Sequence, residues 1–418
     1  MRIYIGVALF AAACTGDITG APAPLQTPPP AAPATSVLVT VRDGDALQPG
    51  VDVLFQNSDG SVVLETKTDA GGAATATMDR GNVTIARTFA PVGSAQRAPE
   101  IYTYVGVNAG DHLVLGDATD DTGTPTIVNV AVPAGANGNV TITSPCGTGA
   151  GTAPTVAMSM AGCPKSVEFY VVDADDDSFL QGASFGPNID LSMGDLEGTL
   201  GTSFSAANVT PDMTSVDVDV FAMDASNELY SSGNQTIATG ADPDAAPETV
   251  NLPNLHGVDE VLVRTINSTM GIQMVASRFP YAALPTPFDA SSNLLAYVSS
   301  PAFKACCVTW TETGGTDAAD FSVATLAITP AGGGAAYTRH IIAAHASGTL
   351  SVPKLAGNDA IYNPSAGDTI GGSVGIGSFD GGYHAAAEFA FGAPNFYDTT
   401  PMSTSIALSY AGDAPPAF

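Results

Sequence analysis

The sequence is poor in basic residues. Its 418 residues contain only 12 Lys and Arg against 41 Asp and Glu, a formal net charge of −29, and the basic residues form no cluster. Because nucleic-acid phosphates are bound through basic side chains, we expect no nucleic-acid partner. An acidic surface with few lysines suits a soluble extracytoplasmic protein.

Long apolar runs and helical periodicity are also lacking. The nearest approach to an apolar period of 3.6 residues lies at 385–391, which we interpret as a strand. Short Val/Thr-rich runs are instead punctuated by 45 Gly and 30 Pro. This pattern predicts an all-β protein, and the length leads us to expect several tandem β-sandwich modules.

The N-terminal segment is apolar over residues 3–13, which is shorter than the roughly 20 residues of a membrane-spanning helix. Behind the positive charge of Arg2, this run predicts a signal peptide over residues 1–13. The sequence Ala11-Ala12-Ala13-Cys14 resembles a bacterial lipobox, although Ala11 stands where leucine is usual. The resemblance implies a lipid on Cys14, and the alternative is ordinary secretion after cleavage at Ala13.

Residues 14–35 are rich in Pro, Ala and Thr and show no alternation. Such a composition favours extended polyproline II structure, so we expect a semi-rigid tether. With the lipid, this predicts a protein anchored in the cell envelope, at the outer membrane or cell surface. The alternative location is secreted.

Residues 36–117 alternate between apolar and polar side chains, which predicts short strands. Turn signals separate them at Pro49-Gly50, Ser58-Asp59-Gly60 and Asp69-Ala70-Gly71-Gly72. Three stretches resemble the carboxypeptidase regulatory-like (prealbumin-like) β-sandwich family: Pro49-Gly50-Val51-x-Val53-x-Phe55, Thr68-Asp69-Ala70-Gly71-Gly72-x-Ala74 and Gly81-x-Val83-Thr84-Ile85. The resemblance implies a fold and no chemistry.

Residues 126–290 contain a weak repeat. Stretches 165–182, 214–233 and 259–278 each read as a strand, a polar turn and a second strand. Three loose copies are few for a propeller, so we favour one or two fused β-sandwich units.

Residues 291–418 read as six or seven short strands, which fits an immunoglobulin-like or fibronectin-like sandwich. Alternation places Val308 and Trp310, the only tryptophan, on one face, and we expect Trp310 to anchor a core. In its Ala/Gly/Asp-rich style the chain beyond residue 117 resembles multi-sandwich surface lipoproteins of bacteria, which implies no activity.

Four cysteines remain when Cys14 is set aside. Cys146 and Cys163 bracket a Gly/Ala/Thr-rich segment, and we expect them to form a disulfide worth about 3 kcal/mol. Cys306 and Cys307 are adjacent. They form either a vicinal disulfide, which needs a distorted peptide and a place at the entry of a strand, or two free thiols.

Candidate sites are weak. Asp173, Asp175 and Asp177 have the spacing of a calcium loop, but Ser178 and Ser184 replace the glycine and glutamate of an EF-hand, so an acidic hairpin turn is the simpler interpretation. A calcium site there, and another at Asp117, Asp120 and Asp121, are secondary hypotheses, and no other cofactor is expected. The stretch 182–186 matches G-x-S-x-G but lacks the helix that a nucleophile elbow needs.

The five histidines are His112, His256, His340, His345 and His384. Alternation places His340 and His345 on opposite faces of a strand, which argues against a shared metal. The sequence contains no P-loop, HExxH motif or paired carboxylates.

We therefore expect a non-enzymatic, lipid-anchored surface protein with a structural role or a protein or glycan partner. The alternative is a secreted or surface glycan-acting enzyme whose site is not visible as a motif. A third hypothesis is a purely structural spacer. An enzyme would be expected to gather His, Arg, Glu and Asp in loops, and this sequence has few of them outside its turns.

Overall fold

The structure is a computed structural model, and it confirms the all-β class. The residues that it describes are 35–43, 46–87, 99–116, 126–132, 139–144, 147–160, 166–173, 178–185, 202–207, 215–223, 229–238, 249–252, 260–267, 272–280, 283, 287–289, 292–315, 317–389 and 405–412. The predicted signal peptide and tether lie outside these ranges, except that Thr35 is described.

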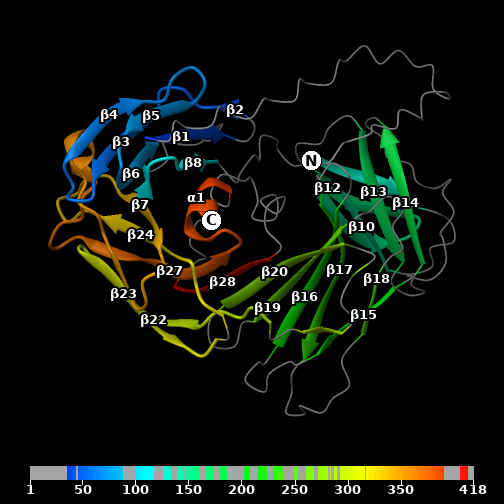
Figure 1. Ribbon diagram of the computed structural model, residues 1–418. Coiled ribbons are helices and arrows are strands. Elements are labelled where there is room, and N and C mark those ends of the chain that lie inside the picture. Colours follow the sequence, from blue (N-terminus) through cyan, green and yellow to red (C-terminus); the bar gives the residue numbers. More distant parts are fainter. Residues whose placement is uncertain are drawn as a thin grey trace. The chain divides into compact units, whose positions relative to one another are not determined.

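The central element is a 12-stranded sheet, called here the long sheet (Figure 1). In spatial order its strands are β17 (Leu229–Ala238), β16 (Ser215–Met223), β19 (Glu260–Asn267), β20 (Ile272–Pro280), β28 (Ser405–Gly412), β27 (Thr369–Phe379), β24 (Phe321–Thr329), β25 (Tyr337–Ala344), β7 (Glu100–Asn108), β6 (Arg80–Arg87), β3 (Asp52–Asn57) and β4 (Val62–Lys67).

Smaller sheets accompany it. The β1 sheet comprises β1 (Ser36–Asp43), β2 (Ala46–Leu47), β5 (Ala73–Thr77) and β8 (His112–Leu115), and the β22 sheet comprises β22 (Tyr297–Lys304), β23 (Cys307–Thr313) and β26 (Thr349–Ser351). A six-stranded sheet contains β9 (Thr126–Ala131), β10 (Asn139–Ser144), β11 (Gly147–Thr152), β12 (Thr155–Met160), β13 (Ser166–Asp173) and β14 (Ser178–Phe185). The remaining sheet joins β15 (Thr202–Ala207), β18 (Thr249–Leu252) and β21 (Phe288–Asp289).

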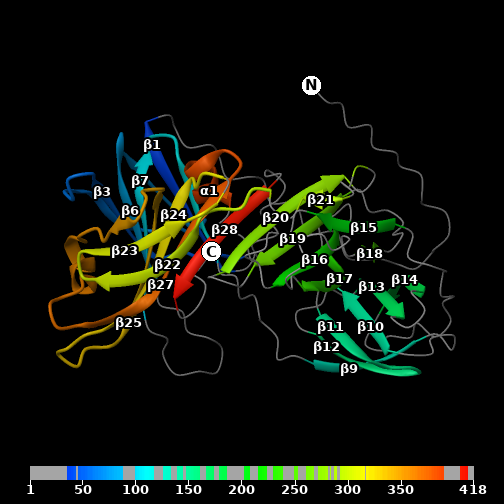
Figure 2. The same cartoon turned by 90° about the horizontal axis from the view of Figure 1, so that it is seen from below.

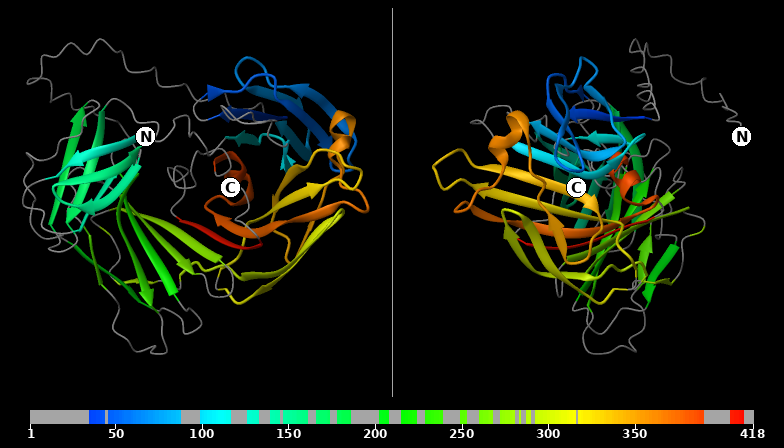
Figure 3. Two further views of the ribbon diagram at one scale, coloured as in Figure 1. Left: turned by 180° about the vertical axis from the view of Figure 1, so that it is seen from behind. Right: turned by 60° about the vertical axis from the view of Figure 1, so that its left-hand side comes forward.

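The first core lies between the β1 sheet and one face of the long sheet. The predicted alternation is confirmed here, because Val37, Val39 and Val41 of β1 are fully buried together with Phe55 of β3. Strands from the far end of the chain join the same core through Phe321, Val323, Ile342 and Leu408. Figure 3 shows this part from two further directions, with residues 36–116 in blue and cyan.

The second core lies on the opposite face of the long sheet, under the β22 sheet. Val308 and Trp310 of β23 are 0% and 6% exposed and pack with Leu326 and Ile341, so Trp310 anchors a core as predicted. Alternation along β24 explains the division, since Phe321 and Val323 face one core while Ala324 and Leu326 face the other.

The two ends of the chain share the long sheet. β25 pairs with β7 in parallel, with Thr338 opposite Glu100 and His340 opposite Tyr102. Strands from 36–117 and from 291–418 therefore lie in one sheet. The division into tandem modules stays a prediction.

The three repeated stretches form three antiparallel hairpins, as predicted. They are β13 with β14, β16 with β17, and β19 with β20. β20 continues into the long sheet by pairing with β28, and these neighbouring strands can be followed in Figure 2.

The interpretation of residues 385–391 as a strand is wrong over 385–389, which are helical, while residues 390 and 391 lie outside the described residues. Residues Gly382–Phe389 form the helix α1, and residues Gly357–Tyr362 form the 3-10 helix η2. Tyr383, Ala386 and Ala387 of α1 are buried in the first core. Their i, i+3, i+4 spacing makes one narrow apolar stripe on the helix. Because alanine is a strong helix former but only weakly hydrophobic, the stripe gives a weak periodic signal in the sequence.

Candidate functional site

The secondary calcium hypothesis and the G-x-S-x-G match both fall on residues that the structure describes only in part. Asp173 ends β13 and pairs with Ser178, while Asp175 and Asp177 lie outside the described residues, as do Asp117, Asp120 and Asp121. Ser184 lies within β14 and pairs with Val167, and a nucleophile elbow instead requires a sharp turn between a strand and a helix. The G-x-S-x-G match is therefore a coincidence of composition.

Of the five cysteines, two lie within the described residues and three lie outside them. Cys14, Cys146 and Cys163 lie outside the described residues, so the lipid and the disulfide expected there stay predictions. Cys306 and Cys307 are free thiols at the entry of β23, with their Sγ atoms 2.8 Å apart.

The most enzyme-like constellation joins a serine, a histidine and a glutamate. Nδ1 of His345 lies 3.0 Å from Oγ of Ser322, and Nε2 of His345 lies 3.5 Å from Oε2 of Glu312. In a hydrolytic triad the histidine must take the proton of a serine that a substrate can reach. Ser322 is 0% exposed, so no substrate reaches its hydroxyl in this arrangement.

The same glutamate has structural duties. Oε1 of Glu312 accepts hydrogen bonds from Nε1 of Trp310 at 2.6 Å and from the backbone N–H of Gly348 at 3.1 Å. Both donors lie at the rim of the second core. Glu312 therefore satisfies two part-buried donors, and its contact with His345 links the β22 sheet to the residue that follows β25.

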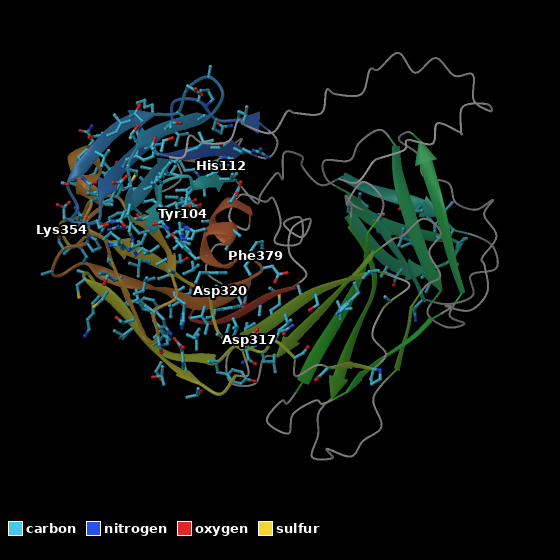
Figure 4. The ribbon with its side chains drawn as sticks, in the orientation of Figure 1. Tyr104, His112, Asp317, Asp320, Lys354 and Phe379 are labelled. Carbon is cyan, nitrogen blue, oxygen red and sulfur yellow. The ribbon has the colours of Figure 1, made fainter. Side chains whose placement is uncertain are left out.

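Asp320 makes a second structural junction, visible with Phe379 in Figure 4. Its Oδ2 accepts hydrogen bonds from Oγ of Ser378 and from the backbone N–H of Phe379, each at 3.0 Å. Its carbonyl accepts the N–H of His345 at 2.8 Å. One residue thereby fastens the ends of β24, β25 and β27.

Helix α1 is held by two histidine–carboxylate contacts that cross between elements. Nδ1 of His384 in α1 lies 2.8 Å from Oδ2 of Asp111. Nδ1 of His112 in β8 lies 3.4 Å from Oε1 of Glu388 in α1. Oγ1 of Thr40 lies 2.9 Å from Nε2 of His112. Figure 4 labels His112. Burial lowers the pKa of His112, although Glu388 acts in the opposite direction.

His340 is buried in the first core, where its ring stacks on Tyr102 at a centroid distance of 4.3 Å. Its Nδ1 lies 3.1 Å from Oγ1 of Thr325, whereas His345 contacts Ser322 on the other face of β24, so the predicted separation of the two histidines is confirmed. Burial, with a smaller contribution from Arg87, lowers the pKa of His340 to about 3. His340 is therefore neutral at physiological pH.

Arg339, the neighbour of His340 on β25, was missed by sequence reasoning. It is 0% exposed, and its Nη2 donates to the carbonyl of Pro353 at 3.0 Å. Among the described residues its Nε and Nη1 have no hydrogen-bond partner. The signal was an arginine at an inward position of an apolar strand.

Within the described ranges no three or more His, Cys, Asp or Glu residues gather closely enough to hold a metal ion. None of the helices in those ranges is long and apolar enough to cross a membrane.

No protein-family model matches the sequence, and a search of curated proteins finds no match.

Proposed function

We propose that this chain is a non-enzymatic protein of the cell envelope, anchored by a lipid on Cys14, whose β-sheet body has a structural or binding role. The observation that carries the proposal is the sequence Ala11-Ala12-Ala13-Cys14 behind a short apolar run and ahead of a Pro-rich segment. A lipid on this cysteine would hold the folded part near a membrane, with the tether setting its distance.

The disposition of the chemically capable side chains supports a non-enzymatic role. Ser322, His340 and Arg339 are buried, and Glu312 and Asp320 accept hydrogen bonds that close sheet ends. These groups stabilise the packing of the sheets. None of them combines a reachable nucleophile with a base, as a hydrolytic site requires.

The anchor is tested by expressing the full chain in a bacterium and following its partition into detergent. We expect the wild-type protein in the detergent phase, with a lipid found on residue 14 by mass spectrometry. Cys14→Ser should move the protein to the aqueous phase, and Thr15→Ser serves as the matched control. Equal membrane retention of Cys14→Ser would overturn the anchor.

The binding role is tested on the purified folded part with arrays of glycans and cell-envelope proteins, with and without calcium. Saturable binding to a glycan or protein supports the proposal. Release of sugar from any glycan would instead establish the glycan-acting enzyme as the function.

A further inference from the structure

The adjacent cysteines occupy the tip of the β22–β23 hairpin. Lys304 pairs with Cys307, so Ala305 and Cys306 form the two-residue turn between the strands. Cys306 is exposed and Cys307 is half-buried. Reagents from solution therefore have access to both sulfurs from one side of the molecule.

The backbone around the pair is fixed by the β22 sheet. The carbonyl of Cys306 accepts the N–H of Val352 at 2.9 Å, and Cys307 pairs with Ser351 as well as with Lys304. Rotation of the Cys306–Cys307 peptide would break these contacts. The pair is thus a rigid element, with two thiols presented together.

This geometry holds two free thiols close together without a disulfide bond. The Sγ atoms are 2.8 Å apart, whereas a disulfide bond is about 2.05 Å long. Neighbouring Cα atoms are about 3.8 Å apart across a trans peptide, which is shorter than the 4.4 Å at the lower end of the usual disulfide range. A single atom bound by both sulfurs needs neither the shorter S–S distance nor a rotated peptide.

We propose that Cys306 and Cys307 form a dithiol site that chelates one thiophilic trivalent metalloid centre, the class represented by organic arsenic(III). Thiolates are soft ligands and select soft centres. Because the described residues offer no third metal-ligating side chain at this site, the third position on arsenic is filled by its own organic group.

The binding step is a substitution without any redox change. A monosubstituted arsenical R–As(OH)2 reacts with the two thiols, so that two S–As bonds form and two As–O bonds break. The two thiol protons leave with the two hydroxyl groups as two water molecules, and arsenic stays trivalent throughout. No oxidant or reductant is needed.

The two sulfurs have different roles in this step. Cys306 is exposed whereas Cys307 is half-buried, so the thiol of Cys306 reacts first. The second S–As bond then closes within the molecule, at a high effective concentration of the Cys307 thiol. Retention of the arsenical therefore depends on both cysteines.

The experiment uses the reduced full chain and phenylarsine oxide, followed by intact mass and peptide mapping. We expect one phenylarsenic group, mapped to the peptide that contains both residues. It should resist a monothiol wash and be removed by a dithiol. Cys306→Ser and Cys307→Ser should each weaken retention by about 100-fold or more.

The controls separate this site from other thiols. The double variant Cys146→Ser/Cys163→Ser should bind as the wild type does, and wild type alkylated with iodoacetamide should not bind even if a serine variant folds poorly. Full retention in either single variant, mapping to another cysteine, or a Cys306–Cys307 disulfide that persists in the reduced preparation would each overturn the proposal.

Discussion

The two faces of the long sheet each bury an arginine, and they accommodate it differently. Arg87, on the side of the first core, lies 5.2 Å from the ring centroid of Tyr102 and donates to the carbonyls of Arg42 and Gly116. Arg339, on the opposite side, donates to one carbonyl, and two of its nitrogens have no partner among the described residues. Burial lowers the pKa of Arg339 to about 10, so its charge persists at neutral pH.

The difference extends to the groups beside the two arginines. His340, on the side of Arg87, becomes neutral by losing its proton, which removes the need for a counterion. Asp359 of η2, on the side of Arg339, has its pKa raised to about 6 by burial and by the negative charges of Asp52 and Glu65, although Arg339 and Lys67 lower it. A buried charged group is stabilised either by hydrogen-bond partners or by losing its charge. On the second face Arg339 keeps its charge, and two of its nitrogens have no hydrogen-bond partner among the described residues.

The largest expected effect tests whether the two faces unfold together. Phe55→Ala empties a fully buried position of the first core and should lower the free energy of unfolding by about 3–5 kcal/mol. Trp310 lies in the second core, so its fluorescence during urea unfolding reports on the other face. We expect the same shift by fluorescence and by circular dichroism, with Ile341→Ala as the matched change in the second core. If Phe55→Ala leaves the urea midpoint of the fluorescence transition unchanged, the two cores unfold independently.

The junction at Glu312 should give the next largest effect. Glu312→Ala leaves the N–H groups of Trp310 and Gly348 without their acceptor, which should destabilise the protein by about 1–3 kcal/mol. Glu312→Gln keeps an oxygen acceptor and should lose less. Urea midpoints of the three proteins measure the difference, and equal midpoints for Ala and Gln would show that the acceptor is unimportant.

The buried histidine should make the first face sensitive to acid. The pKa of His340 is lower in the folded chain than the usual 6.5, so below pH 6.5 the unfolded chain takes up a proton that the folded chain does not. Stability therefore falls as pH falls, with a slope of up to about 1.4 kcal/mol per pH unit from this group. His340→Gln should show a smaller slope between about pH 6.5 and 5. His112→Gln alters a less buried histidine whose pKa is lowered less, so it should reduce the slope less, and an unchanged slope in His340→Gln would contradict the assignment.

A smaller effect is expected at Arg339, the buried arginine of the second face. Arg339→Met keeps an apolar stem of similar length and removes the buried charge, so the free energy of unfolding should change by less than about 1 kcal/mol or increase. Arg87→Met should instead lower it by about 1–2 kcal/mol, because the contacts with Tyr102 and two carbonyls are lost. A larger loss for Arg339→Met than for Arg87→Met would reverse the comparison.

The last effect has the opposite sign in pH. Asp359 binds its proton more tightly in the folded chain, so its contribution to stability falls as pH rises from 3.8 through about 6. Asp359→Asn should lack this fall and gain stability relative to wild type at pH 7. Thermal unfolding of the two proteins at pH 4.5 and 7 tests this, and a gain at the lower pH alone would contradict the sign.

Local features were predictable from the sequence. The shared core face of Val37, Val39 and Val41, that of Val53 and Phe55, and the turn at Gly60, where φ is +85°, follow from neighbouring residues alone. The three hairpins of the repeat were predictable for the same reason, because each pairs strands that adjoin in sequence.

Contacts between distant segments were not predictable. Nothing near His384 indicates that Asp111 will lie beside it, and nothing near Glu312 indicates His345. The pairing of β7 with β25 depends on register across the whole chain. At Gly377 a side chain would collide with the ring of Phe321, and this requirement of the packed cores is visible only once β24 and β27 are paired.

The parallel pairing of β7 with β25 also dictates an order of assembly. During synthesis β7 is complete long before β25 exists, so its outer backbone N–H and C=O groups wait without strand partners. An open strand edge of this kind can pair with another chain, and distant pairings form slowly. A fragment ending at residue 117 would keep that edge permanently, so we expect it to aggregate where the whole chain does not.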